Sequence, residues 1–191
     1  MKKIILIPAF LAFVLTLTAQ SSFPPIDRSP MDMSYYPVDY PILKIQNKAT
    51  DPLIVRIIYG RPQKNDRVIF GDLVPYGSVW RLGANEATEI EFFKDVKIDN
   101  KKIPKGRYTL YAIPDTDKWT IIVNSETNIW GAFKYDSKKD LLRTSAPIQK
   151  QTESTEIFTM LFEKKNSTGA NLVMAWDNVL VKLPFSWTES K

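Results

Sequence analysis

Hydrophobic and polar residues alternate with a period of two along much of the chain, which is typical of half-buried β-strands. In the segment ATEIEFF (87–93), for example, Ile90 and Phe92 alternate with Glu89 and Glu91. The strands expected from this pattern lie at 52–60, 87–93, 118–124, 155–163, 170–176 and 178–185, with two more around a turn in 95–114. Turn residues separate them.

The only segment with a helical pattern is Tyr135–Arg143, about two turns long. Seven or more short strands and no long segment of period 3.6 predict one all-β domain. We expect an antiparallel β-sandwich or jelly roll, assigned to residues 42–187.

Two different segments precede this domain. Lysines at positions 2 and 3, an apolar run Ile4–Leu17 and small residues ending at Ala19 predict a signal peptide, residues 1–19, cleaved before Gln20. The run of 14 apolar residues is shorter than the ~20 that a membrane span needs, so no span is expected. The protein is therefore expected to be periplasmic or secreted.

Residues 20–41 are interpreted as a proline-rich N-terminal arm or linker. Five of the 13 prolines lie within residues 21–41. Proline has no amide hydrogen for a sheet ladder, so we expect an extended segment here rather than a regular element.

Composition excludes several kinds of chemistry. The chain has no histidine and no cysteine, which excludes a Ser-His-Asp triad, a Cys-His pair, the usual zinc sites and a cysteine-linked lipid anchor. We expect neither a metal site nor a cofactor. Removal of residues 1–19 lowers the formal net charge from +5 to 5 − 2 = +3. This mild and scattered positive charge does not indicate nucleic-acid binding.

Several charged residues are expected on faces that should be buried. Counting back in twos from Ile90 places Thr88 and Glu86 on the core side. The same count groups Glu156 with Phe158.

Arg56 lies within LIVRIIY, where neither face of the strand is polar. A buried charge costs several kcal/mol unless it is paired. Arg56, Arg81, Glu86 and Glu156 are therefore either structural ion pairs at the end of the sandwich or part of a ligand pocket, and we expect Arg81 and Glu86 to pair.

The stretch WRLGANEAT (80–88) combines an indole, a guanidinium, an amide and a carboxylate. An exposed loop is also expected at 128–136, around a second tryptophan. The candidate ligand-binding residues are Arg61, Trp80, Arg81, Asn85, Glu86 and Trp130. The arginines would hold an anionic or hydroxylated group, Asn85 and Glu86 would orient it, and Trp80 would stack against it.

Four motifs resemble a family of exported bacterial proteins known as domain of unknown function 2911. They are YGRPQKNDRVIFGDLVPYGSVWRLGANEATEIEF, IPKGRYTLYAIP, WTIIVN and WGAFKYD, and the similarity runs from about residue 59 to 184. The resemblance implies an exported single-domain protein and supplies no activity, cofactor or functional residue.

The sequence thus favours an exported protein that binds a glycan or peptide without catalysis. One alternative is a hydrolase or lyase that uses Glu86 and Glu156 as acid and base. Another is a structural protein of the cell envelope, for which the proline-rich arm is the only indication.

Overall fold

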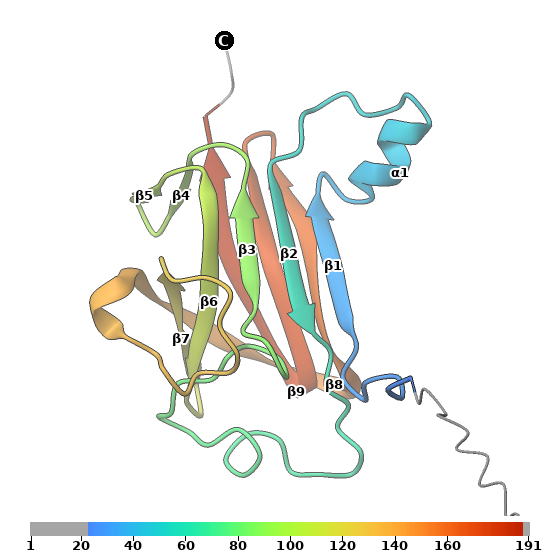
Figure 1. Ribbon diagram of the computed structural model, residues 1–191. Helices are drawn as coiled ribbons and strands as arrows, with labels where there is room; N and C mark the ends of the chain where they lie inside the picture. The colour runs from blue at the N-terminus through green and yellow to red at the C-terminus, as the bar shows by residue number, and fades with distance from the viewer. Residues whose placement is uncertain (1–22, 189–191) are drawn as a thin grey trace, which may run out of the picture.

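The computed structural model describes residues 23–188, and this part of the chain consists mainly of β-strands (Figure 1). Nine strands form one antiparallel sheet in the order β1-β2-β3-β6-β7-β8-β9-β4-β5, which confirms the all-β prediction. The strands are β1 (Met31–Tyr36), β2 (Val55–Gly60), β3 (Glu89–Phe92), β4 (Val96–Ile98), β5 (Lys101–Ile103), β6 (Gly106–Pro114), β7 (Lys118–Asn124), β8 (Asp140–Asn166) and β9 (Gly169–Trp187). A short helix, α1 (Tyr40–Ile45), and a 3₁₀ turn, η1 (Ser137–Lys139), complete the elements.

The sheet folds over into two layers because β8 changes its partner along its length. Residues 140–147 pair with β7, whereas residues 148–166 pair with β9. The first layer therefore contains β1, β2, β3, β6, β7 and the start of β8, and the second contains the rest of β8 with β9, β4 and β5 (Figure 1). The Ser34 hydroxyl donates to the Met160 carbonyl at 2.7 Å and joins β1 to β8 across the two layers.

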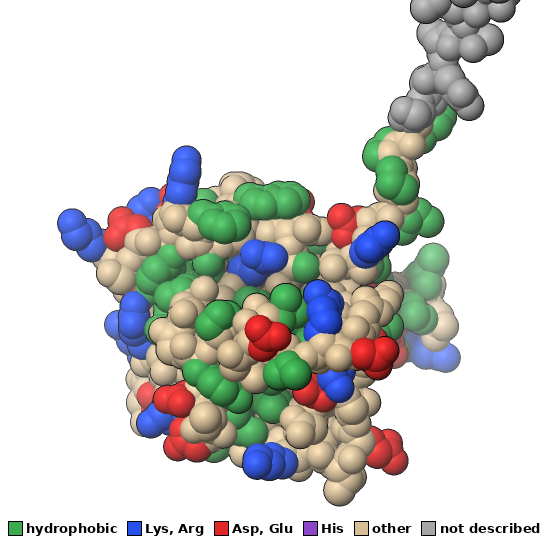
Figure 2. All heavy atoms as spheres, turned by 90° about the horizontal axis from the view of Figure 1, so that it is seen from below, with side chains coloured by type: hydrophobic (Ala, Val, Ile, Leu, Met, Phe, Trp, Pro, Cys, Tyr) green, Lys and Arg blue, Asp and Glu red, His purple; other side chains and the backbone are tan. Residues whose placement is uncertain are grey.

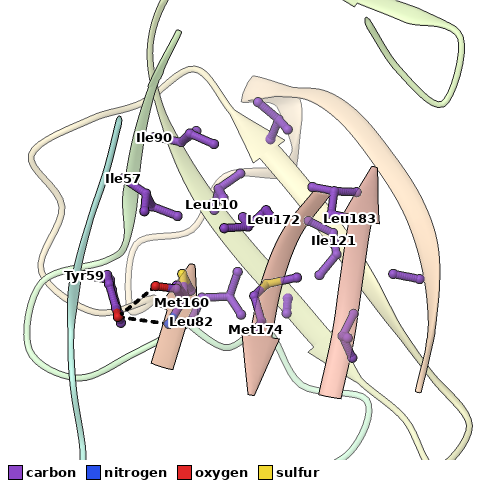
Figure 3. Packing of buried hydrophobic residues seen from close by; sticks show 14 of the residues in the cluster. Ile57, Tyr59, Leu82, Ile90, Leu110, Ile121, Met160, Leu172, Met174 and Leu183 are labelled. Atoms are coloured by element: carbon purple, nitrogen blue, oxygen red, sulfur yellow. Dashed lines mark hydrogen bonds between the residues drawn. The ribbon is translucent and has the colours of Figure 1, made fainter. Parts of the chain in front are cut away.

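The main core lies between the two layers. Alternate residues of each strand point into it, among them Ile57, Ile90, Leu110, Ile121, Met160, Leu172, Met174 and Leu183 (Figure 3). The buried Tyr59 hydroxyl accepts from the Met160 amide at 2.9 Å and donates to its carbonyl at 3.1 Å. Thr88, Phe158 and Met160 are buried as the period-two pattern predicts.

Three element boundaries differ from those expected. The segments 170–176 and 178–185 form the single strand β9, which continues through Asp177 at a left-handed φ of 52°. Pairing with β8 resumes on both sides of Asp177, so this turn-forming residue makes an irregularity instead of a chain reversal. Segment 95–114 contains the three strands β4, β5 and β6. The helical expectation for 135–143 was wrong beyond η1, because residues from Asp140 join the ladder with β7.

Part of the proline-rich segment belongs to the sheet. All six residues of β1 pair with β2, from Met31 opposite Gly60 to Tyr36 opposite Val55. The prolines at 30 and 37 flank this edge strand, where a missing amide hydrogen disturbs no ladder. The helix α1 follows and projects from the body without a buried residue (Figure 1). Within residues 23–188, no helix is both long and apolar enough to cross a membrane.

Candidate functional site

Two long connections contribute to the cover of the outer face of β6 and β7. One joins β2 to β3 (residues 61–88) and the other joins β7 to β8 (residues 125–139). The first of them also adds buried side chains to the main core, namely Ile69, Val74, Trp80 and Leu82. Tyr111 and Ile122 point away from the main core and form a second small core with Ala87. Residues of both connections pack against it, namely Val79, Ile129, Ala132 and Tyr135. The connections are thus held on the sheet by burial of apolar surface.

The same connections bring four of the predicted site residues together. Glu86 and Trp130 form an antiparallel bridge, and the Gly131 amide donates to the Asn85 carbonyl at 2.9 Å. A Cβ placed on Gly131 would lie 3.6 Å from Nη1 of Arg81. These four residues therefore belong to one region, although Arg81 and Glu86 line different cavities.

The backbone of residues 82–85 is a tight loop pressed against the end of β2. Leu82 and Asn85 have left-handed φ values of 52° and 62°. A Cβ on Gly60 would lie 2.3 Å from the Ala84 carbonyl oxygen, so only glycine allows this approach. Within the loop, Nε1 of Trp80 donates to the Gly83 carbonyl at 3.1 Å.

Arg81 is a partly buried cation that forms no ion pair within residues 23–188. Its Nε is buried and has no hydrogen-bond partner, and no carboxylate among residues 23–188 pairs with its guanidinium. Burial lowers the pKa of Arg81 from its ordinary value. The residue lines a cavity of about 260 Å³ that is otherwise mostly apolar, with Leu73, Val74, Pro75, Ser78, Val79, Trp80, Ala132 and Phe133. This cavity is called the Arg81 cavity below.

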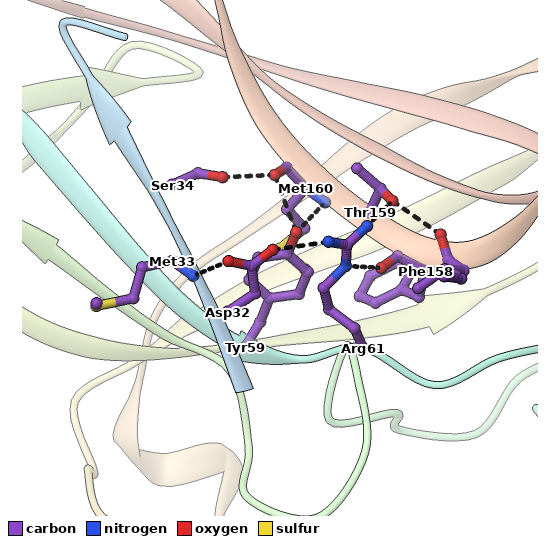
Figure 4. Close-up of polar contacts among 9 residues, drawn as sticks. Asp32, Met33, Ser34, Tyr59, Arg61, Phe158, Thr159 and Met160 are labelled. Atoms are coloured by element: carbon purple, nitrogen blue, oxygen red, sulfur yellow. Dashed lines mark hydrogen bonds and ion pairs between the residues drawn. The ribbon is translucent and has the colours of Figure 1, made fainter. Parts of the chain in front are cut away.

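The other two candidate arginines have partners. Arg61 donates to Oδ2 of Asp32 at 2.8 Å, to Oγ1 of Thr159 at 2.9 Å and to the Phe158 carbonyl at 3.2 Å (Figure 4). These bonds tie β1 to β8, and Arg61 does not line the Arg81 cavity. Arg56 pairs with Glu91, its neighbour across the β2–β3 ladder, in place of Glu86 or Glu156.

The aromatic residues divide into a buried cluster and an exposed pair. The Trp80 ring is only 9% exposed and stacks on Trp176 with ring centroids 5.9 Å apart. Little of this ring is open to stack on a ligand. Trp130 and Phe133, by contrast, are 60% and 81% exposed on the second connection. Sequence reasoning missed Phe133, which follows Trp130 by three residues in the same loop.

The view from below shows hydrophobic side chains exposed in separate patches among isolated charged residues (Figure 2). The first connection contributes several of the exposed large hydrophobic residues, Val68, Leu73 and Tyr76. Leu73 is both exposed and part of the Arg81 cavity wall. The rim of the cavity is therefore apolar.

The prediction that Glu86 and Glu156 face the core was wrong. Both are exposed. Glu86 lies outside β3, which begins at Glu89, and the neighbouring Ala87 and Thr88 are both buried, so the alternation does not extend back to Glu86. Glu156 lies next to an irregular part of the β8–β9 ladder. Oε1 of Glu156 accepts from the Asn65 amide at 2.9 Å. The expected pair between Arg81 and Glu86 is not among the ion pairs of residues 23–188.

Glu86 lines a second, smaller cavity of about 140 Å³, and the lining does not include Glu156. Glu89 also lines it, but Oε1 of Glu89 accepts from the Asn128 amide at 2.6 Å and Oε2 lies 3.5 Å from Nη1 of Arg107. Within residues 23–188, no three side chains of Asp and Glu gather as a metal site would require.

A polar network anchors the second connection to β8. Oδ2 of Asp140 accepts from the Tyr135 hydroxyl at 2.5 Å and from Nε of Arg143 at 2.7 Å. Oδ1 of Asp140 accepts from Nδ2 of Asn124 at 2.8 Å. Desolvation, together with the hydrogen bond to Asp140, raises the pKa of Tyr135 to about 12. The network holds the loop that carries Trp130 and Phe133.

The family of the chain follows from comparison with known proteins. The family profile described as protein of unknown function (DUF2911) matches residues 42–185. The chain therefore belongs to this family, as the four sequence motifs indicated. Comparisons with curated proteins and with solved structures found no match.

Replacement of Arg61 and of Arg81 by methionine should have different effects on the free energy of unfolding. Arg61→Met removes an ion pair and two hydrogen bonds, so we expect the free energy of unfolding to fall by about 2 kcal/mol. Arg81→Met removes a desolvated cation with no partner, so the free energy of unfolding should stay within ~0.5 kcal/mol or rise. Urea denaturation of both variants measures the difference. A large loss for Arg81→Met would show that Arg81 stabilises the fold.

Tyr135 should make stability depend on alkaline pH. Its pKa in the folded protein, about 12, exceeds the ordinary value of 10.0 for tyrosine. The contribution of Tyr135 to the free energy of unfolding is therefore complete below about pH 10 and is lost as the pH rises towards 12. Tyr135→Phe should lower the melting temperature at pH 8. The substitution should also make the melting temperature fall less between pH 9 and 11.5, because residue 135 then has no phenol to titrate. Other tyrosines with raised pKa values titrate in both proteins, so the difference between the two melting curves isolates Tyr135. Parallel curves would contradict this role.

Proposed function

We propose that this protein is an exported binding protein that holds a carboxylate-bearing ligand in the Arg81 cavity without catalysis. The observation that supports it is the buried Nε of Arg81 without a hydrogen-bond partner. A desolvated cation is costly when it has no counter-charge. An arriving carboxylate would supply that charge and could accept two parallel hydrogen bonds from the planar guanidinium.

The size and walls of the cavity define the ligand further. Its volume of about 260 Å³ is close to the lower limit of ~300 Å³ for small-molecule sites. One terminal unit of a longer molecule fits this volume better than a whole large ligand does. Phe133 lines the cavity and is largely exposed, with Trp130 nearby on the same connection. These rings suit a peptide side chain or the face of a sugar ring.

Binding is better supported than hydrolysis or elimination. A two-carboxylate mechanism needs an acid and a base on either side of the reacting bond. Glu86 and Glu156 do not line one common cavity, and the oxygens of Glu89 are engaged by Asn128 and Arg107. Arg81, by contrast, has hydrogen-bond donors available to a ligand.

Isothermal titration calorimetry of residues 20–191 tests the ligand class with matched probes. One pair is an acetylated peptide with a free C-terminal carboxylate and its C-terminal amide. The other pair is an oligogalacturonate and its methyl ester. We expect one acid to bind at least about tenfold more tightly than its neutral partner, in line with a charge-assisted bidentate pair worth about 1.5–3 kcal/mol.

Arg81→Met should abolish this preference. Lys134→Met is the matched control, because it removes one positive charge from the exposed position beside Phe133 that does not line the cavity. Equal losses of affinity in the two variants would show that the acid binds by general electrostatic attraction and not through Arg81. Failure of every acid to bind would overturn the proposal.

The export part of the proposal rests on the N-terminal pattern, which lies outside the described residues. Expression of the full chain in a bacterial host should yield protein outside the cytoplasm that begins at Gln20, because small residues before it suit signal peptidase. Intact-mass spectrometry of the exported fraction measures this. A chain that keeps Met1 and stays in the cytoplasm would contradict export.

A further inference from the structure

Two larger cavities share lining residues near Trp187, the last residue of β9. Figure 1 shows that β9 ends on the opposite side of the sandwich from the connection of residues 61–88. Their volumes are about 590 and 570 Å³, and Lys94 and Trp187 line both. Each volume is within the range of ~300–1,000 Å³ that is usual for small-molecule sites. The two cavities together are called the Trp187 groove.

Trp187 is a partly exposed ring held in a fixed position. Its centroid lies 5.4 Å from that of Tyr36 and 6.0 Å from that of Phe185. Its backbone pairs with Val96 of β4, and its amide donates to the Thr168 carbonyl at 2.9 Å. An aromatic ring that is fixed before binding offers a stacking surface at little cost in side-chain entropy.

The charged side chains of the groove are mainly basic. Four lysines line it, at 94, 97, 102 and 164, against the aspartates at 51 and 95, so the balance is 4 − 2 = +2. Asp95 pairs with Lys102 at 2.7 Å. Lys97 and Lys164 are exposed and approach the groove from different strands, β4 and β8.

Hydroxyl groups complete the lining. Ser167 borders the first cavity, and Thr168 and Ser186 border the second. A hydroxyl can donate and accept a hydrogen bond, which suits a ligand that itself carries many hydroxyls. A partly exposed indole that lines both cavities, basic side chains and hydroxyls form a combination that matches sugar rings with acidic substituents.

We propose that the Trp187 groove is a second binding site that takes an acidic oligosaccharide. One sugar ring lies against Trp187, neighbouring units occupy the two cavities, and their carboxylates lie near Lys97 and Lys164. This proposal does not depend on the function of the Arg81 cavity, which is formed by other connections at the other end of the molecule.

The test is calorimetric titration of oligogalacturonate into residues 20–191 carrying Arg81→Met, so that the first site does not contribute. The lining variant is Lys97→Glu with Lys164→Glu. Its matched control is Lys101→Glu with Lys165→Glu, which reverses two exposed charges close by that do not line the groove. We expect the lining variant to weaken binding at least about tenfold and the control by less than about threefold.

Two further measurements separate specific binding from charge attraction. The neutral methyl ester should bind at least about tenfold more weakly than the acid. Trp187→Phe, with its melting temperature checked, should weaken binding several-fold, because a smaller ring offers less stacking surface. Equal losses in the lining and control variants, equal affinity for the ester, or no binding of the acid would overturn the proposal.

Discussion

Burial of both faces of β6 and β7 is the constraint on which the site depends. Their inner residues, such as Leu110 and Ile121, pack in the main core. Their outer residues Tyr111 and Ile122 are also apolar and need cover. The two connections supply this cover, since a sheet face of this kind is unstable in contact with water. Positions far apart in the chain, Arg81 and Gly131, become neighbours as a result.

Arg56, Arg61 and Arg81 differ in the partners that the fold gives their guanidinium groups. Arg61 meets a carboxylate of β1 and a carbonyl of β8. Arg56 pairs with Glu91 of the neighbouring strand, although its Nε is also buried without a hydrogen-bond partner. Arg81 follows a buried tryptophan in a loop whose neighbours are mainly apolar, and no acceptor reaches its Nε. An unsatisfied buried donor reduces stability. It is retained at low cost only if part of the group reaches solvent or meets a ligand, and Arg81 remains partly exposed.

The two ends of the sandwich differ in how their cavities are built. The Arg81 cavity is small, lined mainly by apolar side chains of two long connections, and contains one cation. The Trp187 groove is larger and is bordered by strand ends, a short hairpin and several lysines. The two places therefore suit ligands of different size.

Local alternation in the sequence determined the all-β class and the inward-facing residues of several strands, including Ile90, Phe92 and Phe158. The burial pattern follows from the strand period, which is a local property of the chain. The candidate site residues were identified separately, from the types of side chain in the stretch from Trp80 to Glu86, at Trp130 and at Arg61. The fold brings the first two together and leaves Arg61 outside the Arg81 cavity.

Only the tertiary structure decided which charged groups have partners and which are exposed. Glu86 is exposed because β3 begins only at Glu89 and the alternation does not extend to the residues before it. β1 forms because β2 offers a free edge to a segment that looked like a linker. Ion pairs and cavities depend on residues that are distant in sequence. A period counted along one strand contains no information about them.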